Sequence, residues 1–185
     1  MNIHALRLPV IVAPRFTLRP FVEEDCESLQ KAINDERVAR KVTNIPFPYT
    51  LMHAREWIRK TESWVTADSK RVDFAIVVDG KVCGSVSFIN IDGHKAQVSY
   101  WLTQNLWGKG IVPEALSHLL RFGFEEMGLV RIYAYVYTEN TKSARVLEKA
   151  GFQFEGIHRK EWRKMIERKY QYFNSNYYAI VKEDV

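Results

Sequence analysis

Hydrophobic and polar residues alternate along three stretches of the chain, which is the pattern of strands with one buried face. The first stretch, 16–22 (FTLRPFV), predicts a strand near the N-terminus. The second, 73–90, has Asp79-Gly80 between two apolar runs, a dipeptide typical of a β-hairpin turn. The third, 91–102, opens on another Asp-Gly pair. The second and third stretches therefore predict three antiparallel strands joined in a meander, because the second contains two strands.

Apolar residues recur at helical spacing in four other segments. These segments are 23–42, 51–65, 113–127 and 139–152. Acidic residues open the first of them, where they complement the positive end of the helix dipole. Asn140 or Thr141 can cap the last one with a side-chain oxygen. The remaining apolar runs, at 130–137, 152–162 and 169–181, predict three more strands.

The order of these elements predicts the fold class. The meander leads into the helix at 113–127 and then into the strand at 130–137, which makes a βαβ crossover in a sheet that began antiparallel. We expect an α+β fold, an α/β/α sandwich with a twisted, mixed, mainly antiparallel sheet and helices on both faces. No repeat or linker divides the chain, so residues 1–185 are predicted to form a single domain.

Composition narrows the class of protein. Hydrophobic residues make up 46% and charged residues 26%, which is typical of globular proteins. No apolar run is long enough to span a bilayer, and the opening MNIHALRLPVIVAP is read as a strand and not as a signal peptide, so we expect no membrane association. The two cysteines, Cys26 and Cys83, predict core packing in a reducing, cytoplasmic compartment. The histidines are scattered, and no metal is expected. The net charge of +5 indicates acidic partners.

A glycine-rich turn, NLWGKGIVPEA (105–115), joins the third strand of the meander to a helix. Gly108 and Gly110 permit a tight turn, and the start of a helix offers free N–H groups and positive potential to an anion. The turn lacks the Gly-Lys-Ser/Thr ending of a P-loop and the third glycine of a dinucleotide fingerprint. Two interpretations remain, a backbone nest for a pyrophosphate and a tight connection without a ligand.

The run VSYWLTQNLWGKGIVPEAL (98–116), followed by NTKSARVLEKAGF (140–152), resembles the GNAT superfamily of acyl-CoA-dependent N-acetyltransferases, and within it the RimJ/RimL-like group. FTLRPFVEEDCESL and YYAIVKED look like the first and last elements of this group, so the resemblance covers essentially the whole chain. It implies acetyl-CoA as co-substrate and direct transfer of an acetyl group to a primary amine.

The resemblance also implies which residues hold acetyl-CoA. The backbone of 107–112 would hold the pyrophosphate, strand 97–102 would line the pantetheine, and two residues of the next helix would lie near the thiol. Asn105 departs from the Gln or Arg that often starts this loop, so one anchoring contact differs. The predicted cofactor-binding residues are Leu102, Trp107, Gly108, Lys109, Gly110, Ile111, Val112, Asn140 and Ser143.

The catalytic residues depart from the superfamily pattern. Many members carry a catalytic tyrosine seven residues after the conserved asparagine, and Leu147 stands there. Ser143 is the replacement that the RimL-like pattern implies, although its hydroxyl can equally cap the helix. Glu161 is the matching candidate for the base, although an exposed ion pair explains it as well. Rival candidates for the base are Glu155, Glu139, Asp92, a water chain and the backbone.

The acceptor and the partners stay open at this stage. The resemblance implies either a protein N-terminal α-amine or a small amine such as a polyamine, an amino acid or an antibiotic. The basic cluster HRKEWRKMIERKY (158–170) indicates contact with RNA or the ribosome through 158–169, or else a solvated hairpin. A non-catalytic RNA- or ribosome-binding module and a silent acyl-CoA sensor are the alternative hypotheses. A monomer or a homodimer is expected.

Overall fold

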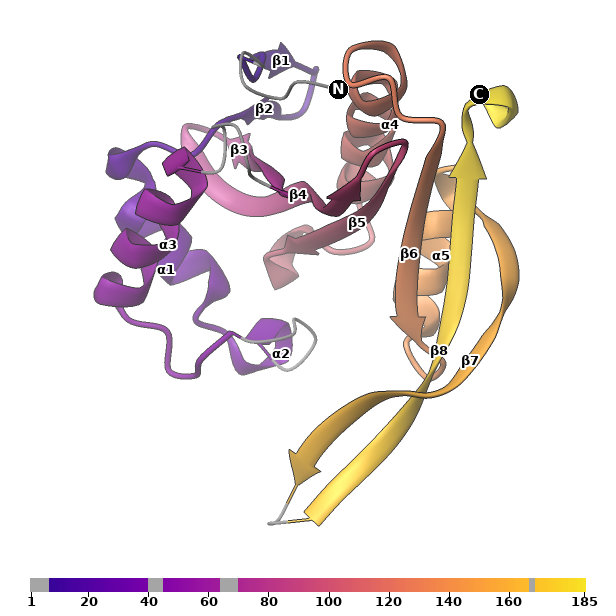
Figure 1. Ribbon diagram of the computed structural model, residues 1–185. Coiled ribbons are helices and arrows are strands. Elements are labelled where there is room, and N and C mark those ends of the chain that lie inside the picture. The colour runs from indigo at the N-terminus through magenta and orange to yellow at the C-terminus, as the bar shows by residue number, and fades with distance from the viewer. Residues whose placement is uncertain (1–6, 40–44, 64–69, 167–168) are drawn as a thin grey trace.

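An eight-stranded sheet runs through the computed structural model, which describes residues 7–39, 45–63, 70–166 and 169–185 (Figure 1). The strands lie in the order β1-β2-β3-β4-β5-β6-β8-β7. All neighbouring strands are antiparallel except β5 and β6, which are parallel. Their bounds are β1 Ile11–Val12, β2 Thr17–Arg19, β3 Val72–Val78, β4 Lys81–Asp92, β5 Lys95–Leu102, β6 Arg131–Tyr137, β7 Gln153–Ile166 and β8 Lys169–Val181. The predicted mixed sheet is confirmed.

Helices cover both faces of this sheet, also as predicted (Figure 1). They are α1 Cys26–Ile33, α2 Glu36–Ala39, α3 Leu51–Ser63, α4 Ile111–Glu125 and α5 Thr141–Lys149. The helix expected over 23–42 is interrupted within its described part. Asn34 leaves the helical conformation at φ −77° and ψ 48°, and its side-chain oxygen accepts the backbone N–H of Tyr49 at 2.8 Å. A contact with a residue distant in sequence therefore ends α1, where local spacing predicted continuation.

Two hydrophobic cores result from the alternation of β3, β4 and β5. Phe74, Ile76 and Phe88 point to one face and pack with α4 and α5. Ala75, Val77 and Trp101 point to the other face and pack with α1 and α3. Because each strand of the meander contributes to both cores, its backbone is fixed on both sides. No helix among the described residues is long and apolar enough to cross a membrane.

Strands β5 and β6 separate soon after they begin. Their pairing is limited to Lys95–Gln97 opposite Arg131–Tyr133, and beyond these residues the two strands diverge (Figure 1). The backbone edges of 98–102 and 134–137 therefore face a gap within the sheet and not each other. This divergence places the ends of β5 and β6, and the loops that follow them, around one site.

The last two strands form a long hairpin that extends beyond the body of the protein (Figure 1). The strand expected at 152–162 continues to Ile166, and β8 lies between β6 and β7. The register of β7 against β8 shifts between His158 and Trp162. Within this shift, Lys160 has a φ of 56° and donates its backbone N–H to the side chain of Asn174 at 2.9 Å. We call the described residues 159–166 and 169–173, which comprise the shift and the part of the hairpin beyond it, the arm.

Candidate active site

The glycine turn connects β5 to α4 by a short loop with two left-handed residues. Gly108 has a φ of 75° and Gly110 a φ of 76°, a region that side chains other than glycine rarely adopt. A Cβ added to Gly108 would meet no atom within 4 Å, so the backbone there borders open space. Trp107 anchors the start of the loop, because its indole N–H donates to the carbonyl of Leu102 at 2.7 Å. The loop is thus both fixed and accessible.

Arg15, which lies between β1 and β2, holds the same loop from another side. Its Nη1 donates to the carbonyl of Lys109 at 2.5 Å, and its Nε donates to Glu114 Oε2 at 3.0 Å. A second nitrogen of Arg15 also contacts Glu114, which makes an ion pair at the first turn of α4. The backbone N–H of Trp107 donates to the carbonyl of Gln104 at 3.0 Å. Because the guanidinium of Arg15 engages the loop through a carbonyl, the N–H groups that follow Trp107 stay available to a ligand.

The start of α4 adds further N–H donors to the loop. The first helical bond in this turn runs from the N–H of Glu114 to the carbonyl of Gly110 at 3.3 Å. Ile111 and Val112 occupy the first helical positions, where backbone N–H groups have no partner within the helix. Pro113 brings no N–H at all. The left-handed loop and this helix start together form a suitable nest for an anion.

A cavity of about 480 Å³ opens beside the loop, between β5, α4 and α5. Its charged lining residues are the cations Lys142, Arg145 and Lys149, all on α5. Every residue predicted to bind the cofactor lines this cavity except Lys109, which belongs to the loop but contributes its carbonyl to Arg15. The cations of α5 and the backbone donors of the loop match the phosphates of a CoA thioester, and the apolar residues of the lining match its pantetheine chain.

The first turn of α5 presents a hydroxyl at the end of this cavity. Asn140 is the cap residue, and its side-chain oxygen accepts the backbone N–H of Ser143 at 3.3 Å. The Ser143 hydroxyl has a different partner: its Oγ lies 2.6 Å from the hydroxyl oxygen of Tyr100 on β5. The cap and the hydroxyl are therefore separate, and the second interpretation of Ser143 as the helix cap is wrong. Leu147, where many relatives carry tyrosine, is fully buried.

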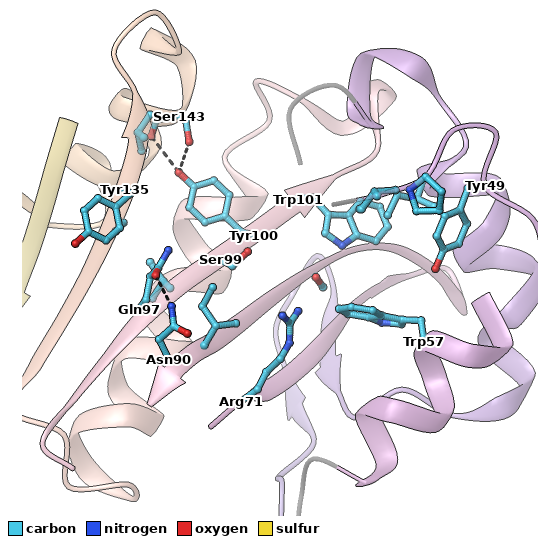
Figure 2. A pocket seen from close by; sticks show the side chains of 18 of the residues that line it. Tyr49, Trp57, Arg71, Asn90, Gln97, Ser99, Tyr100, Trp101, Tyr135 and Ser143 are labelled. Carbon is cyan, nitrogen blue, oxygen red and sulfur yellow. Dashed lines mark hydrogen bonds between the residues drawn. The ribbon is translucent and has the colours of Figure 1, made fainter. Parts of the chain in front are cut away.

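A second cavity, of about 570 Å³, lies on the other side of this serine (Figure 2). Tyr100, Trp101, Asn140 and Ser143 line both cavities, so the two meet at the hydroxyl pair. Both volumes fall in the range of small-molecule sites, about 300–1,000 Å³. The arrangement suits a reaction between two ligands that enter from different sides.

The lining of the second cavity combines aromatic rings with neutral polar groups. Trp57, Tyr135 and Trp162 approach it from α3, β6 and the arm. The side-chain amides of Asn90 and Gln97 lie on its floor, joined by a hydrogen bond of 2.9 Å (Figure 2). Such amides offer both donors and acceptors, which is what a peptide backbone requires.

The guanidinium of Arg71, on the wall of this cavity, is fixed by contacts with Asp73 and Trp57. Arg71 donates to both carboxylate oxygens of Asp73, at 2.7 and 2.9 Å, and stacks on Trp57 with its central carbon 4.7 Å from the ring centre. The Asp73 side chain is 1% exposed and also accepts the hydroxyl of Ser87. A buried carboxylate with several donors is well satisfied, so this cluster is a fixed part of the wall.

The two catalytic residues predicted from sequence lie apart. Ser143 lies where the cavities meet, whereas Glu161 is on the arm, where its carboxylate is 3.5 Å from His158. Glu161 lines neither cavity, and neither do the rival carboxylates Glu155, Glu139 and Asp92. Of the residues that the structure describes, Glu56 on α3 is the carboxylate that lines the second cavity. No group of three metal-ligating side chains gathers in the described ranges.

Tyr100 is the site residue that sequence reasoning missed. In the sequence it is one of many aromatic residues on alternating strands, and its partner is 43 residues away. Burial raises the pKa of the Tyr100 phenol to about 12, and the hydrogen bond to Ser143 opposes that rise only in part. The phenol is therefore neutral at physiological pH and able to donate a proton to a hydrogen bond.

Comparison with known proteins agrees with this geometry. Residues 15–153 match the family described as Acetyltransferase (GNAT) domain. The chain is 32% identical over 154 residues to "Uncharacterized N-acetyltransferase p20" of Bacillus licheniformis, across 81% of this chain and 85% of that protein. It is 31% identical over 149 residues to "Putative ribosomal N-acetyltransferase YdaF" of Bacillus subtilis, across 78% of this chain and 81% of that protein.

A solved structure shows the same fold. Mycobacterium smegmatis RimJ, in complex with CoA-disulfide, superposes with a TM-score of 0.79 at 23% identity, across 96% of this chain and 87% of that chain. The predictions of a GNAT fold, of an acetyltransferase and of acetyl-CoA as co-substrate are confirmed. The chain belongs to the GNAT family and is an N-acetyltransferase.

Proposed function

We propose that this enzyme acetylates the α-amine at the N-terminus of a protein, with a ribosomal protein as the first candidate. The observation that carries the proposal is the second cavity, which meets the cavity beside the glycine loop at Ser143 and is lined by the Asn90–Gln97 amide pair and by aromatic rings. The naming of YdaF as a ribosomal N-acetyltransferase supports the same class of acceptor.

The donor side of the proposal assigns the cavity near the glycine loop to acetyl-CoA. The backbone N–H groups of 108–112 and the cations Lys142, Arg145 and Lys149 would hold its phosphates, since the N–H of Trp107 is already bonded to Gln104. The open edge of β5, from 98 to 102, would run along the pantetheine chain, which extends the sheet as an added strand would. The thioester would then lie beside Asn140 and Ser143, where the two cavities meet.

The proposed reaction is a direct transfer, in which the protein forms no covalent bond with the acetyl group. The acceptor nitrogen attacks the thioester carbon, a C–N bond forms, the C–S bond breaks and the electron pair stays on sulfur. Charge develops first on the carbonyl oxygen and then on the sulfur, and hydrogen-bond donors that face these atoms lower the barrier. We assign Ser143 the role of donor to the departing sulfur.

An α-amine also suits the second cavity, which we call the acceptor cavity, because such an amine needs only a weak base. An N-terminal amine has a pKa of about 7.7–8.0, so roughly a tenth of it is already deprotonated at pH 7. An amine with a pKa of about 10.4, such as a lysine side chain, is deprotonated to only about 0.04%. The charged residues of the lining are Glu56, Lys60 and Arg71, and the remaining polar groups are mostly amides and hydroxyls. Cations nearby favour the neutral form of an amine, so this cavity can accept the first kind of amine without a strong base.

Matched peptides test the acceptor. One peptide carries a free α-amine and a blocked lysine, and its partner has a blocked α-amine and a free lysine. We expect the first to be acetylated at least tenfold faster, as measured by release of CoA and by mass spectrometry of the product. Polyamines, free amino acids and aminoglycosides complete the panel. Turnover confined to these small amines would overturn the protein-acceptor proposal.

A second candidate function is contact with RNA through the arm, in addition to catalysis. The arm projects from the body and carries Arg159, Lys160, Arg163, Lys164 and Lys169 (Figure 1). Tyr172 is more than half exposed, and exposed aromatic residues can stack on bases. Tyr170 is also more than half exposed, with Arg163 over one face of its ring. The predicted segment 158–169 includes two residues, 167 and 168, that lie outside the described ranges.

Salt dependence tests the arm. If it binds RNA through phosphates, affinity for a ribosomal RNA fragment should fall steeply with salt, and Lys164→Gln with Lys169→Gln should reduce the slope by about two. Acetyl-CoA affinity should be unchanged in the same variant. An RNA affinity that does not change with salt would overturn RNA binding by the arm, and the arm would then be a solvated hairpin.

A further inference from the structure

Tyr100 reaches across the gap between β5 and β6 to the first turn of α5. Its hydroxyl contacts two atoms of one residue: Ser143 Oγ at 2.6 Å and the Ser143 carbonyl oxygen at 3.1 Å (Figure 2). These contacts lie where the acceptor cavity and the CoA cavity meet. A half-buried hydroxyl here needs a hydrogen-bond partner, and its partner is the residue whose side chain lies where both cavities meet.

We infer that Tyr100 is a positioning residue for catalysis: its hydroxyl donates to Ser143 Oγ and so turns the Ser143 proton toward the departing sulfur. The inference rests on the proposed placement of the thioester beside Ser143.

Proton counting supports this role. Each hydroxyl has one proton, so the pair has two arrangements. In one, Tyr100 donates to the Ser143 carbonyl and Ser143 donates to Tyr100. In the other, Tyr100 donates to Ser143 Oγ, which frees the serine proton for an acceptor in the cavity. A sulfur that gains negative charge favours the second arrangement, because the two aligned hydrogen bonds polarise each other.

Neither hydroxyl has to ionise in this step. Burial raises the pKa of Tyr100 to about 12, so the phenol keeps its proton while the reaction runs near neutral pH. When the C–S bond breaks, the thiolate accepts a hydrogen bond from Ser143. The proton that the acceptor nitrogen loses passes by way of Glu56 to solvent, and solvent later protonates the thiolate. The chain from Tyr100 to Ser143 to sulfur stabilises charge and transfers no net proton.

The test is Tyr100→Phe, which keeps the ring and removes only the hydroxyl. The full chain is assayed with whichever amine the parent acetylates, in single turnovers with acetyl-CoA already bound. We expect the rate to fall at least tenfold while the Kd for acetyl-CoA stays within twofold. The rate of Ser143→Ala should fall at least as far. The double variant should be no slower than Ser143→Ala alone, because both substitutions interrupt the same chain of hydrogen bonds.

Tyr178→Phe is the matched control. Tyr178 lies on β8, and its buried hydroxyl also bonds to a side chain of α5, Glu148, at 3.1 Å. Neither residue lines a cavity, so this variant removes a hydroxyl bond to α5 outside the site, and we expect the parent rate.

A rate within twofold of the parent in Tyr100→Phe would overturn the inference, and so would losses that multiply in the double variant. If Tyr100→Phe does not fold, the single-turnover rate of Ser143→Ala is the deciding measurement. A rate equal to that of the parent would overturn the inference, because Ser143 would then have no catalytic role for Tyr100 to support. Failure of the peptide panel would not affect this test, since it uses any amine that reacts.

Discussion

Arg15 and Glu114 form an ion pair that joins the N-terminal strands to the first turn of α4, and Arg15 Nη1 also holds the carbonyl of Lys109 at 2.5 Å. Because the loop of Lys109 is the proposed pyrophosphate site, Arg15→Ala should loosen it. We expect acetyl-CoA to bind about five- to tenfold more weakly, roughly 1–1.4 kcal/mol, in titration calorimetry.

Arg121→Ala is the control for this change. Arg121 pairs with Glu125 on the same helix, with Nε 3.0 Å from the carboxylate, but lies away from the loop. Its loss should leave acetyl-CoA affinity within twofold. Equal affinities in the two variants would contradict a bracing role for Arg15.

Gly108 tests whether the loop itself binds acetyl-CoA. Gly108→Ala forces a side chain into a φ of 75°, which costs about 1–2 kcal/mol of stability, and places a methyl group on the open side of the loop. Gly80→Ala, in the β3–β4 turn, creates the same strain at a φ of 73° and also meets no neighbour within 4 Å.

The two glycine variants should therefore lose similar free energies of unfolding in denaturant titrations. Only Gly108→Ala should weaken acetyl-CoA binding, by tenfold or more, because its methyl group intrudes where the phosphate lies. Parallel losses of affinity in both variants would mean that the loop is only a turn.

Alkaline stability tests the burial of Tyr100. The unfolded chain ionises its tyrosines near pH 10, whereas burial raises the pKa of Tyr100 to about 12 in the folded state. Below pH 10 both states keep the proton, so stability is unaffected. Between pH 10 and 12 only the unfolded state releases it, and the free energy of unfolding falls by up to about 1.4 kcal/mol per pH unit.

Tyr100→Phe should remove that part of the slope, as followed by urea unfolding at several pH values. Tyr49, whose pKa burial also raises to about 12, will still contribute a decline in the variant. Tyr170→Phe, with a ring that is 53% exposed, is the control and should leave the slope unchanged. Identical slopes in parent and Tyr100→Phe would show that the phenol is solvated.

Substitution of two carboxylates tests which residue is the base that removes the proton of the acceptor amine. Glu56 lines the acceptor cavity, whereas Glu161 faces His158 on the arm. We expect Glu56→Gln to lower kcat/KM for the amine about tenfold at neutral pH and less at high pH, where the amine loses its proton unaided. The kcat/KM of Glu161→Gln should stay within twofold of the parent value. The reverse ranking would restore Glu161 as the base.

The sequence predicts the site best where backbone chemistry decides it. Gly108, Gly110 and the cap at Asn140 follow from local rules on left-handed residues and helix starts. The hydrophobic alternation likewise predicts β3, β4 and β5 to within two or three residues at most boundaries. These features depend on neighbours in the chain, and they are therefore visible in one sequence.

Contacts between distant segments are what the sequence hides. The end of α1 depends on Asn34 meeting Tyr49, and the bracing of the loop depends on Arg15 meeting Lys109 and Glu114. Tyr100 looks like any strand tyrosine until the divergence of β5 and β6 brings it to α5. No local pattern encodes such encounters, because packing of the whole fold creates them.

The most direct test of the account is the crystal structure of this protein with CoA bound. The account predicts the pyrophosphate on the backbone N–H groups of 108–112, the pantetheine along β5, and the sulfur in contact with Ser143 Oγ where Tyr100 meets it. A CoA molecule bound outside the gap between β5 and β6, or a sulfur directed away from Ser143, would contradict the central claim.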